Sequence, residues 1–105
     1  MPLHPQFDAF LKQIAAAGAR SFHEMSVDDC RQAYRTFQAS LPPSAQTLSA
    51  VEDRQVTGPA GPLRLRVYRP PGATPHPVLV YLHGGGWVVG DLETHDRVCR
   101  ELCGG

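Results

Sequence analysis

Residues 78–87 read VLVYLHGGGW, and this stretch decides the fold. Its first five residues are apolar without interruption, which is typical of a strand that is covered on both faces within an α/β sheet. The run leads directly into a histidine and three glycines, residues 83–86. Consecutive glycines accept backbone angles that other residues resist, and they let a ligand come close to main-chain N–H groups. The sequence therefore predicts a buried strand over residues 78–82, followed by a loop that binds a ligand through its backbone.

Two kinds of ligand compete for such a loop, a phosphate group and the oxyanion of an acyl-transfer reaction. A phosphate-binding P-loop ends in Gly-Lys-Ser/Thr, but no lysine follows these glycines. A dinucleotide fingerprint, G-x-G-x-x-G, fails as well, because Val89 stands where the third glycine is required. An oxyanion hole needs only fixed N–H donors aimed at the oxygen on which charge develops. The pattern favours the oxyanion hole.

The string YLHGGGWVVGD at residues 81–91, followed by Thr94-His95-Asp96 and Arg100, closely resembles the hormone-sensitive-lipase family of α/β-hydrolases. Bacterial esterases of that family begin with two cap helices, and continue with an edge hairpin and a buried strand that enters the oxyanion loop. The resemblance covers essentially all 105 residues. It implies an α/β fold class, the N-terminal portion of an α/β-hydrolase fold.

The same resemblance implies a role for each residue of the loop. The backbone N–H groups of Gly84 and Gly85 line the oxyanion hole, and Gly86 lets the chain turn. His83 braces the loop by hydrogen bonding and does not exchange protons with substrate. Trp87 packs under or beside the loop, with a place in the wall of the acyl pocket as the second interpretation.

The pattern of the remaining chain agrees with this order of elements. Residues 1–45 are expected to form the N-terminal cap, with one helix that ends at Gly18 and a second that is capped by Ser26 and ends at Pro42. The apolar stripe of the second helix is either a core face or a surface for a lid or a partner. Residues 46–105 are expected to be the first, incomplete part of the hydrolase core.

Within residues 46–105 the sequence predicts an antiparallel hairpin at the edge of a sheet, with strands over residues 51–57 and 63–68 and a turn over 58–62. After the glycine loop, a helix is expected over residues 94–103. Asp91 or Thr94 is expected to cap its start, and Gly104 to take the left-handed position after its end.

The composition of the chain argues against several classes of function. Ten basic and ten acidic residues give no net charge, so nothing attracts the chain to nucleic acid. No apolar run is long enough to span a bilayer, and the first residues do not resemble a signal peptide. Three cysteines without a C-x-x-C pair argue against a metal site and a disulfide framework. We expect a cytoplasmic protein with no cofactor and no metal.

The catalytic triad is not in this sequence. None of its serines lies in the G-x-S-x-G context of a hydrolase nucleophile, and the triad of such enzymes follows the oxyanion loop. We therefore expect residues 1–105 alone to be inactive and unstable, and the sheet to be completed by the remainder of a longer chain or by another copy. The complete protein is expected to be a serine carboxylesterase that hydrolyses short- to medium-chain acyl esters. The alternatives are a non-catalytic relative that binds small molecules, and a fragment that docks a protein partner.

Overall fold

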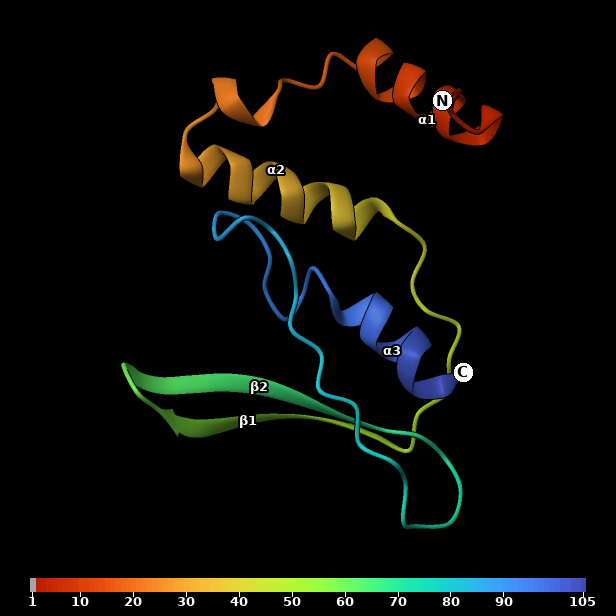
Figure 1. Ribbon diagram of the computed structural model, residues 1–105, viewed down its shortest axis with the longest axis vertical. Coiled ribbons are helices and arrows are strands. Elements are labelled where there is room, and N and C mark those ends of the chain that lie inside the picture. Colours follow the sequence, from red (N-terminus) through yellow and green to blue (C-terminus); the bar gives the residue numbers. More distant parts are fainter. Residues whose placement is uncertain (1) are drawn as a thin grey trace.

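The computed structural model describes residues 2–105, and Figure 1 shows three layers along its longest axis. Two helices lie at one end, a two-stranded sheet lies at the other, and a third helix lies between them. In chain order the elements are α1 (Pro5–Ala16), the 3-10 turn η1 (Phe22–Glu24), α2 (Val27–Ser40), β1 (Ala50–Gly58), β2 (Gly61–Arg69) and α3 (Asp96–Gly104).

The first two helices begin and end where the sequence predicted. Pro5 occupies the first turn of α1, where its missing N–H is not needed, and Gly18 has a left-handed φ of 68° just beyond the helix. The Ser26 hydroxyl accepts a hydrogen bond from the Asp29 amide at 3.1 Å and caps α2. That helix ends at Ser40, two residues before Pro42. Both predicted helices are confirmed.

The hairpin is also confirmed. β1 and β2 pair antiparallel along their whole length, from Ala50 opposite Arg69 to Gly58 opposite Gly61. α3 packs against β2, and the linker that precedes β1 is tied to α3 by a hydrogen bond of 2.8 Å from the Ser44 hydroxyl to Glu101. These contacts make the hairpin, the linker and α3 one unit.

The start of α3 differs slightly from the expectation. The helix begins at Asp96, and a turn precedes it in which the Asp91 amide donates to Thr94 Oγ1 and the Thr94 amide donates to Asp91 Oδ1, both at 2.8 Å. Gly104 is the last residue of α3 and does not lie beyond the helix end. Each of the two candidate capping residues thus satisfies an amide of the other.

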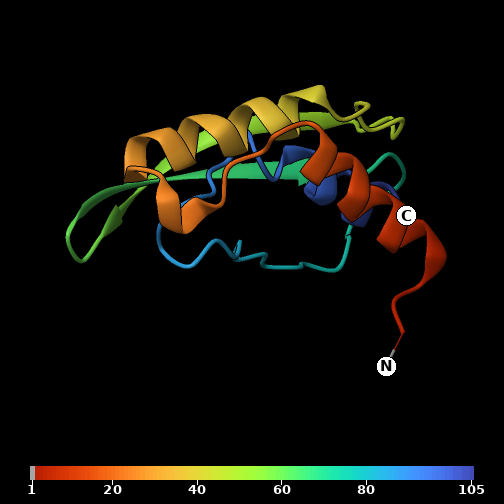
Figure 2. The ribbon, with the colours of Figure 1, turned by 90° about the horizontal axis from the view of Figure 1, so that it is seen from above.

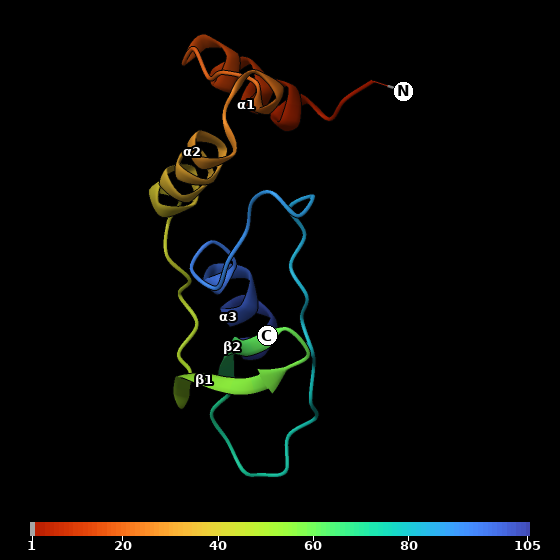
Figure 3. The same ribbon diagram turned by 90° about the vertical axis from the view of Figure 1, so that its left-hand side faces the viewer.

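The prediction of a buried strand over residues 78–82 is wrong for this chain. The segment is extended, but it pairs with no strand within residues 2–105, and its side chains are exposed, with Val78 at 90% and Leu82 at 86%. Figure 3 shows it running alone on the side of α3 opposite the linker. A strand requires a neighbouring backbone to accept and donate its hydrogen bonds, and the hairpin does not provide one here. An uninterrupted apolar run is typical of a covered strand, but no group within residues 2–105 covers this one.

Few side chains are buried. Among the described residues only Cys30, Val89 and Thr94 are buried, and the accessible surface is 8486 Å². A compact protein of this mass exposes about 5,800 Å². The radius of gyration is 16.9 Å, against about 13 Å for a compact chain of this length. Figure 2 shows the open side, where the extended segment lies away from the helices. Residues 2–105 do not enclose a core of their own.

Candidate active site

The loop after the extended segment has a backbone that only glycine adopts easily. Gly85 and Gly90 have φ of 135° and 106°, and Gly86 and Trp87 both have φ of 58°. Side chains with a Cβ rarely take up such angles. Gly85, Gly86 and Gly90 therefore allow the chain to reverse direction between residues 83 and 91.

His83 holds the beginning of this loop. Its Nδ1 lies 2.8 Å from the carbonyl oxygen of Gly84, and because a carbonyl only accepts, Nδ1 is the donor. The ring also stacks on that of His95, with 4.9 Å between ring centroids. Gly90 lies against this arrangement, since a Cβ at position 90 would be 2.6 Å from His83 Nδ1. The sequence analysis did not foresee that Gly90 is the residue that makes room for His83.

A second restraint acts on the carbonyl of Gly85. The amides of Val88 and Val89 both donate to it, each at 3.0 Å. Within residues 2–105, the N–H groups of Gly84, Gly85 and Gly86 donate to no other group of the protein. The carbonyl side of the loop is thus engaged, and its amides stay available to a ligand.

Trp87 does not lie where the sequence predicted. Its side chain is fully exposed and packs neither under nor beside the loop within the described residues. Its backbone has a left-handed φ of 58°, and no group among residues 2–105 covers the side chain.

The far end of the loop is held by α2. Arg31 Nε donates to the carbonyl oxygen of Val88 at 2.8 Å, and Arg35 Nε lies 2.7 Å from Asp91 Oδ2. Burial would raise the pKa of Asp91, but hydrogen bonds from Thr94 and the Arg35 guanidinium outweigh it, and the pKa lies below its ordinary value. Asp91 is therefore ionised at neutral pH and remains paired with Arg35.

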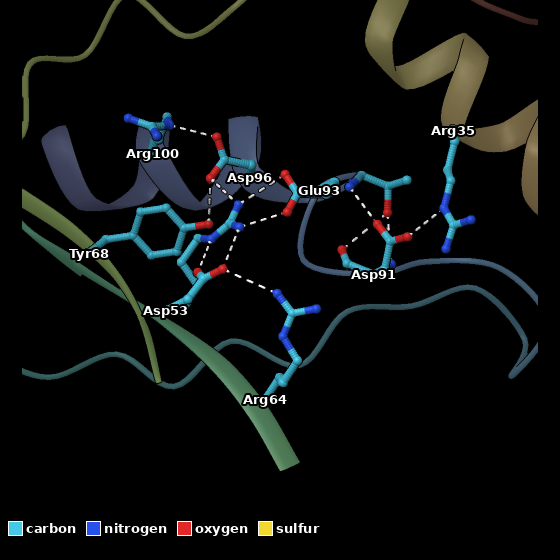
Figure 4. A network of polar contacts seen from close by, with 10 residues as sticks. Arg35, Asp53, Arg64, Tyr68, Asp91, Glu93, Asp96 and Arg100 are labelled. Carbon is cyan, nitrogen blue, oxygen red and sulfur yellow. Dashed lines mark hydrogen bonds and ion pairs between the residues drawn. The ribbon is translucent and has the colours of Figure 1, made fainter. Parts of the chain in front are cut away.

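A larger network joins the hairpin to α3 (Figure 4). Arg66, whose side chain is only 12% exposed, forms ion pairs with Asp53 at 2.5 Å, Glu93 at 2.7 Å and Asp96 at 3.0 Å. The hydrogen bonds that Arg66 donates to these carboxylates, first of all to Asp53, raise the pKa of Arg66 against the effect of burial. The Tyr68 hydroxyl donates to Asp96 at 2.9 Å. The network fixes α3, and with it the end of the glycine loop, on the sheet.

Two further effects on pKa follow from this network. Burial, supported by the hydrogen bond to Asp96, raises the pKa of Tyr68. Burial of Asp96 would raise its pKa, but hydrogen bonds from Arg100, Tyr68 and Arg66 outweigh this and lower it. The Asp96 carboxylate is therefore charged at neutral pH.

The sequence analysis assigned no role to Arg31, Arg35 or Arg66. One signal was present for the network, because Asp53 stands directly opposite Arg66 in the hairpin register, and opposite charges at such positions attract. No signal of that kind existed for Arg31 and Arg35, whose partners lie 57 and 56 residues away along the chain.

A hollow of about 440 Å³ lies between α2 and α3, lined among others by Gln38, Tyr81 and His95. The glycine loop is not part of its lining. Within residues 2–105, no three His, Cys, Asp or Glu side chains gather as metal ligands would. None of the described helices has the length and apolarity that crossing a lipid bilayer requires.

The order of elements and the glycine loop define a class of protein. A family profile described as alpha/beta hydrolase fold matches residues 79–105. The predicted fold class, an N-terminal portion of an α/β-hydrolase fold, is confirmed except for the unformed strand.

Individual relatives are esterases. The chain is 43% identical over 82 residues to the carboxylic ester hydrolase LipN of Mycobacterium tuberculosis. This alignment covers 75% of this chain and 22% of that protein. It is 33% identical over 110 residues to the ethyl acetate hydrolase of Pseudomonas putida, covering 97% of this chain and 35% of that protein. Among solved structures, the hyperthermophilic esterase of the archaeon Pyrobaculum calidifontis superposes with a TM-score of 0.85 at 40% identity, covering 97% of this chain and 33% of that chain. The chain thus spans about a third or less of the length of these relatives.

Proposed function

We propose that residues 1–105 are the part of a serine carboxylesterase that carries the oxyanion hole, and that the complete protein hydrolyses short- to medium-chain acyl esters. One observation carries the proposal: the glycine loop is held by its carbonyl groups and leaves its amides free. The esterase activity of the relatives supports the same conclusion.

The two restraints on the loop determine where its donors point. In a trans peptide the C=O and the N–H that follows it point in opposite directions. His83 holds the carbonyl of Gly84, and this fixes the Gly85 amide. Val88 and Val89 hold the carbonyl of Gly85, and this fixes the Gly86 amide.

The Gly85 and Gly86 amides are therefore the preorganised donors that we propose for the oxyanion. The Gly84 amide, also expected there, follows the carbonyl of His83, which no group within residues 2–105 restrains. Gly86 thus takes a donor's role in addition to the turn, and His83 acts as the brace.

Donors of this kind are useful in acyl transfer. When a serine attacks an ester, the carbonyl oxygen gains negative charge in the tetrahedral intermediate, and fixed N–H groups stabilise that charge without reorganising. We propose that the serine, the acid and the histidine come from a later segment of the same polypeptide, in the order that such hydrolases use. We propose that Trp87, fully exposed here, forms part of the acyl-pocket wall once that segment is in place.

The extended residues 78–82 support the need for such a segment. Their apolar side chains stand in solvent, where a strand with an open edge promotes aggregation. We propose that a strand from the remainder of the polypeptide, or from another copy, pairs with this segment. We also propose that residues 1–45 act as the cap and residues 46–105 as the first part of the core, within the hormone-sensitive-lipase-like branch of the family.

A cytoplasmic location remains part of the proposal. Cys30, Cys99 and Cys103 are all free thiols, as a reducing compartment would keep them. Counting the free thiols of the protein isolated from cells under alkylating conditions tests this, and a disulfide among the three would contradict it.

The experiment that tests the function uses the complete polypeptide that contains residues 1–105. We expect it to hydrolyse p-nitrophenyl butyrate and to be inactivated by an alkyl phosphonate that labels one serine. Residues 1–105 alone serve as the matched control and should do neither. Binding of the ester without turnover would favour the non-catalytic relative. If the complete polypeptide neither binds nor hydrolyses the ester, the proposal is refuted.

A further inference from the structure

α2 touches the glycine loop through two arginines. Arg31 and Arg35 are four residues apart and therefore lie on one face of the helix. Arg31 donates to the Val88 carbonyl at 2.8 Å, and Arg35 pairs with Asp91 at 2.7 Å. Figure 4 shows Arg35 extending from α2 to Asp91. Both contacts fall on residues 88–91, the segment that closes the loop.

That segment is the one that holds the Gly85 carbonyl. Val88 is engaged at both of its polar groups, since its carbonyl accepts from Arg31 and its amide donates to Gly85 at 3.0 Å. Val89 makes the second bond to Gly85 and is buried. A continuous series of hydrogen bonds thus runs from α2 through Val88 to the carbonyl of Gly85.

Asp91 anchors the other end of the segment. It exchanges two hydrogen bonds with Thr94, each of 2.8 Å, and Thr94 is buried. The Arg35 ion pair connects this turn to α2 as well. The segment is therefore attached to the cap helix at two points three residues apart.

We propose that Arg31 and Arg35 are positioning residues, which let α2 hold residues 88–91 so that these residues keep the Gly85 carbonyl, and hence the loop amides, in place for the oxyanion. The proposal rests on the proposed esterase function. It gives the cap helix a part in the chemical step in addition to any part in covering the substrate.

The contacts are weak enough to be removed without unfolding the protein. The side chain of Arg35 is 56% exposed, that of Arg31 is 48% exposed, and exposed ion pairs contribute little to stability. Their loss should therefore change the geometry of the loop more than the fold. From the energies typical of such pairs, we expect kcat to fall about fivefold for either single substitution and about tenfold or more for both.

The test compares variants of the complete polypeptide with p-nitrophenyl butyrate as substrate. The double variant Arg31→Met/Arg35→Met should lower kcat about tenfold and change KM less than about twofold, because the oxyanion forms only after substrate binds. Arg54→Met is the matched control, since it removes an exposed ion pair of 2.7 Å on the hairpin that does not touch the loop. Arg35→Lys keeps the charge opposite Asp91 and should recover most of the kcat that Arg35→Met loses.

A second measurement separates positioning from a general effect on folding. Hydrogen exchange at the Val88 and Val89 amides, which donate to Gly85, should become faster in the double variant and stay unchanged in Arg54→Met. A double variant with the kcat of the control overturns the proposal, and so does a lower kcat without faster exchange at these amides. If the unmodified protein hydrolyses no ester, the proposed function fails. Unchanged exchange in the double variant then also refutes the attachment of the loop to α2.

Discussion

Replacing Gly85 with alanine disturbs the loop at the point where the structure leaves no space. A Cβ at this position would overlap the carbonyl oxygen of Val89 and lie 2.7 Å from its carbonyl carbon. These are backbone atoms, so no side-chain rotation relieves the contact. The φ of 135° adds strain for any residue that has a Cβ. Residues 85–89 must open, and both hydrogen bonds to the Gly85 carbonyl are lost.

The expected loss of kcat follows from the loop amides that those hydrogen bonds keep in place. Loss of one oxyanion donor raises the barrier by about 3–4 kcal/mol, which is roughly 10²–10³-fold in kcat. We expect Gly85→Ala in the complete polypeptide to lower kcat for p-nitrophenyl butyrate by about this factor, with a much smaller change in KM.

Gly84→Ala is the matched control. A Cβ at position 84 meets no atom within 4 Å, and the residue has no left-handed φ. We expect this variant to keep kcat within about tenfold of the unmodified enzyme, because its amide is the one that the loop does not restrain. The reasoning would be refuted if Gly85→Ala kept more than about a tenth of kcat, or if both variants lost activity equally. Melting temperatures of both variants show whether the loss reflects the loop or the fold.

Three further predictions concern stability and aggregation. Arg66→Met in the complete protein should lower the free energy of unfolding by about 1–2 kcal/mol, because two of the three carboxylate partners of Arg66 are exposed enough to regain water. In a thermal melt this should lower Tm by roughly 3–6 °C. A shift in Tm no larger than that of Arg54→Met would contradict this prediction. Acidification should destabilise the protein: the pKa of folded Asp96 is lowered, so its contribution is complete above its ordinary pKa of about 3.9 and is lost as pH falls below it. A Tm that stays constant from pH 5 to pH 3 would exclude such a contribution. Leu79→Asp should reduce light scattering by residues 1–105 alone, because Leu79 is 68% exposed on the extended segment; equal scattering would show that this segment does not drive aggregation.

Local signals in the sequence identified the elements that depend on local chemistry. Ser26 and Pro42 mark the ends of α2 because a hydroxyl satisfies an early amide and a proline has none to offer. The hairpin followed from alternation and a turn rich in Gly and Pro. The prediction of a strand over residues 78–82 failed because a strand needs a second backbone to pair with. An apolar run does not show which segment provides that backbone.

In the candidate site, too, local features could be predicted from the sequence, and features that depend on distant groups could not. The glycine run located the loop, since left-handed backbone angles favour glycine, as at Gly85 and Gly86. The exposure of Trp87 could not be read from the run, because it depends on which groups cover that side of the loop. The attachment of Arg31 to the Val88 carbonyl joins segments 57 residues apart, and no spacing rule connects them.

The large accessible surface of residues 2–105 has a consequence for thermodynamic measurements. Because the chain buries so little apolar area by itself, its melting temperature is determined by the groups that cover residues 78–82. Shielding by a second copy obeys mass action, so dilution would lower the midpoint. Shielding by the same polypeptide is unimolecular, and the midpoint would not depend on concentration. A dilution series therefore distinguishes the two sources.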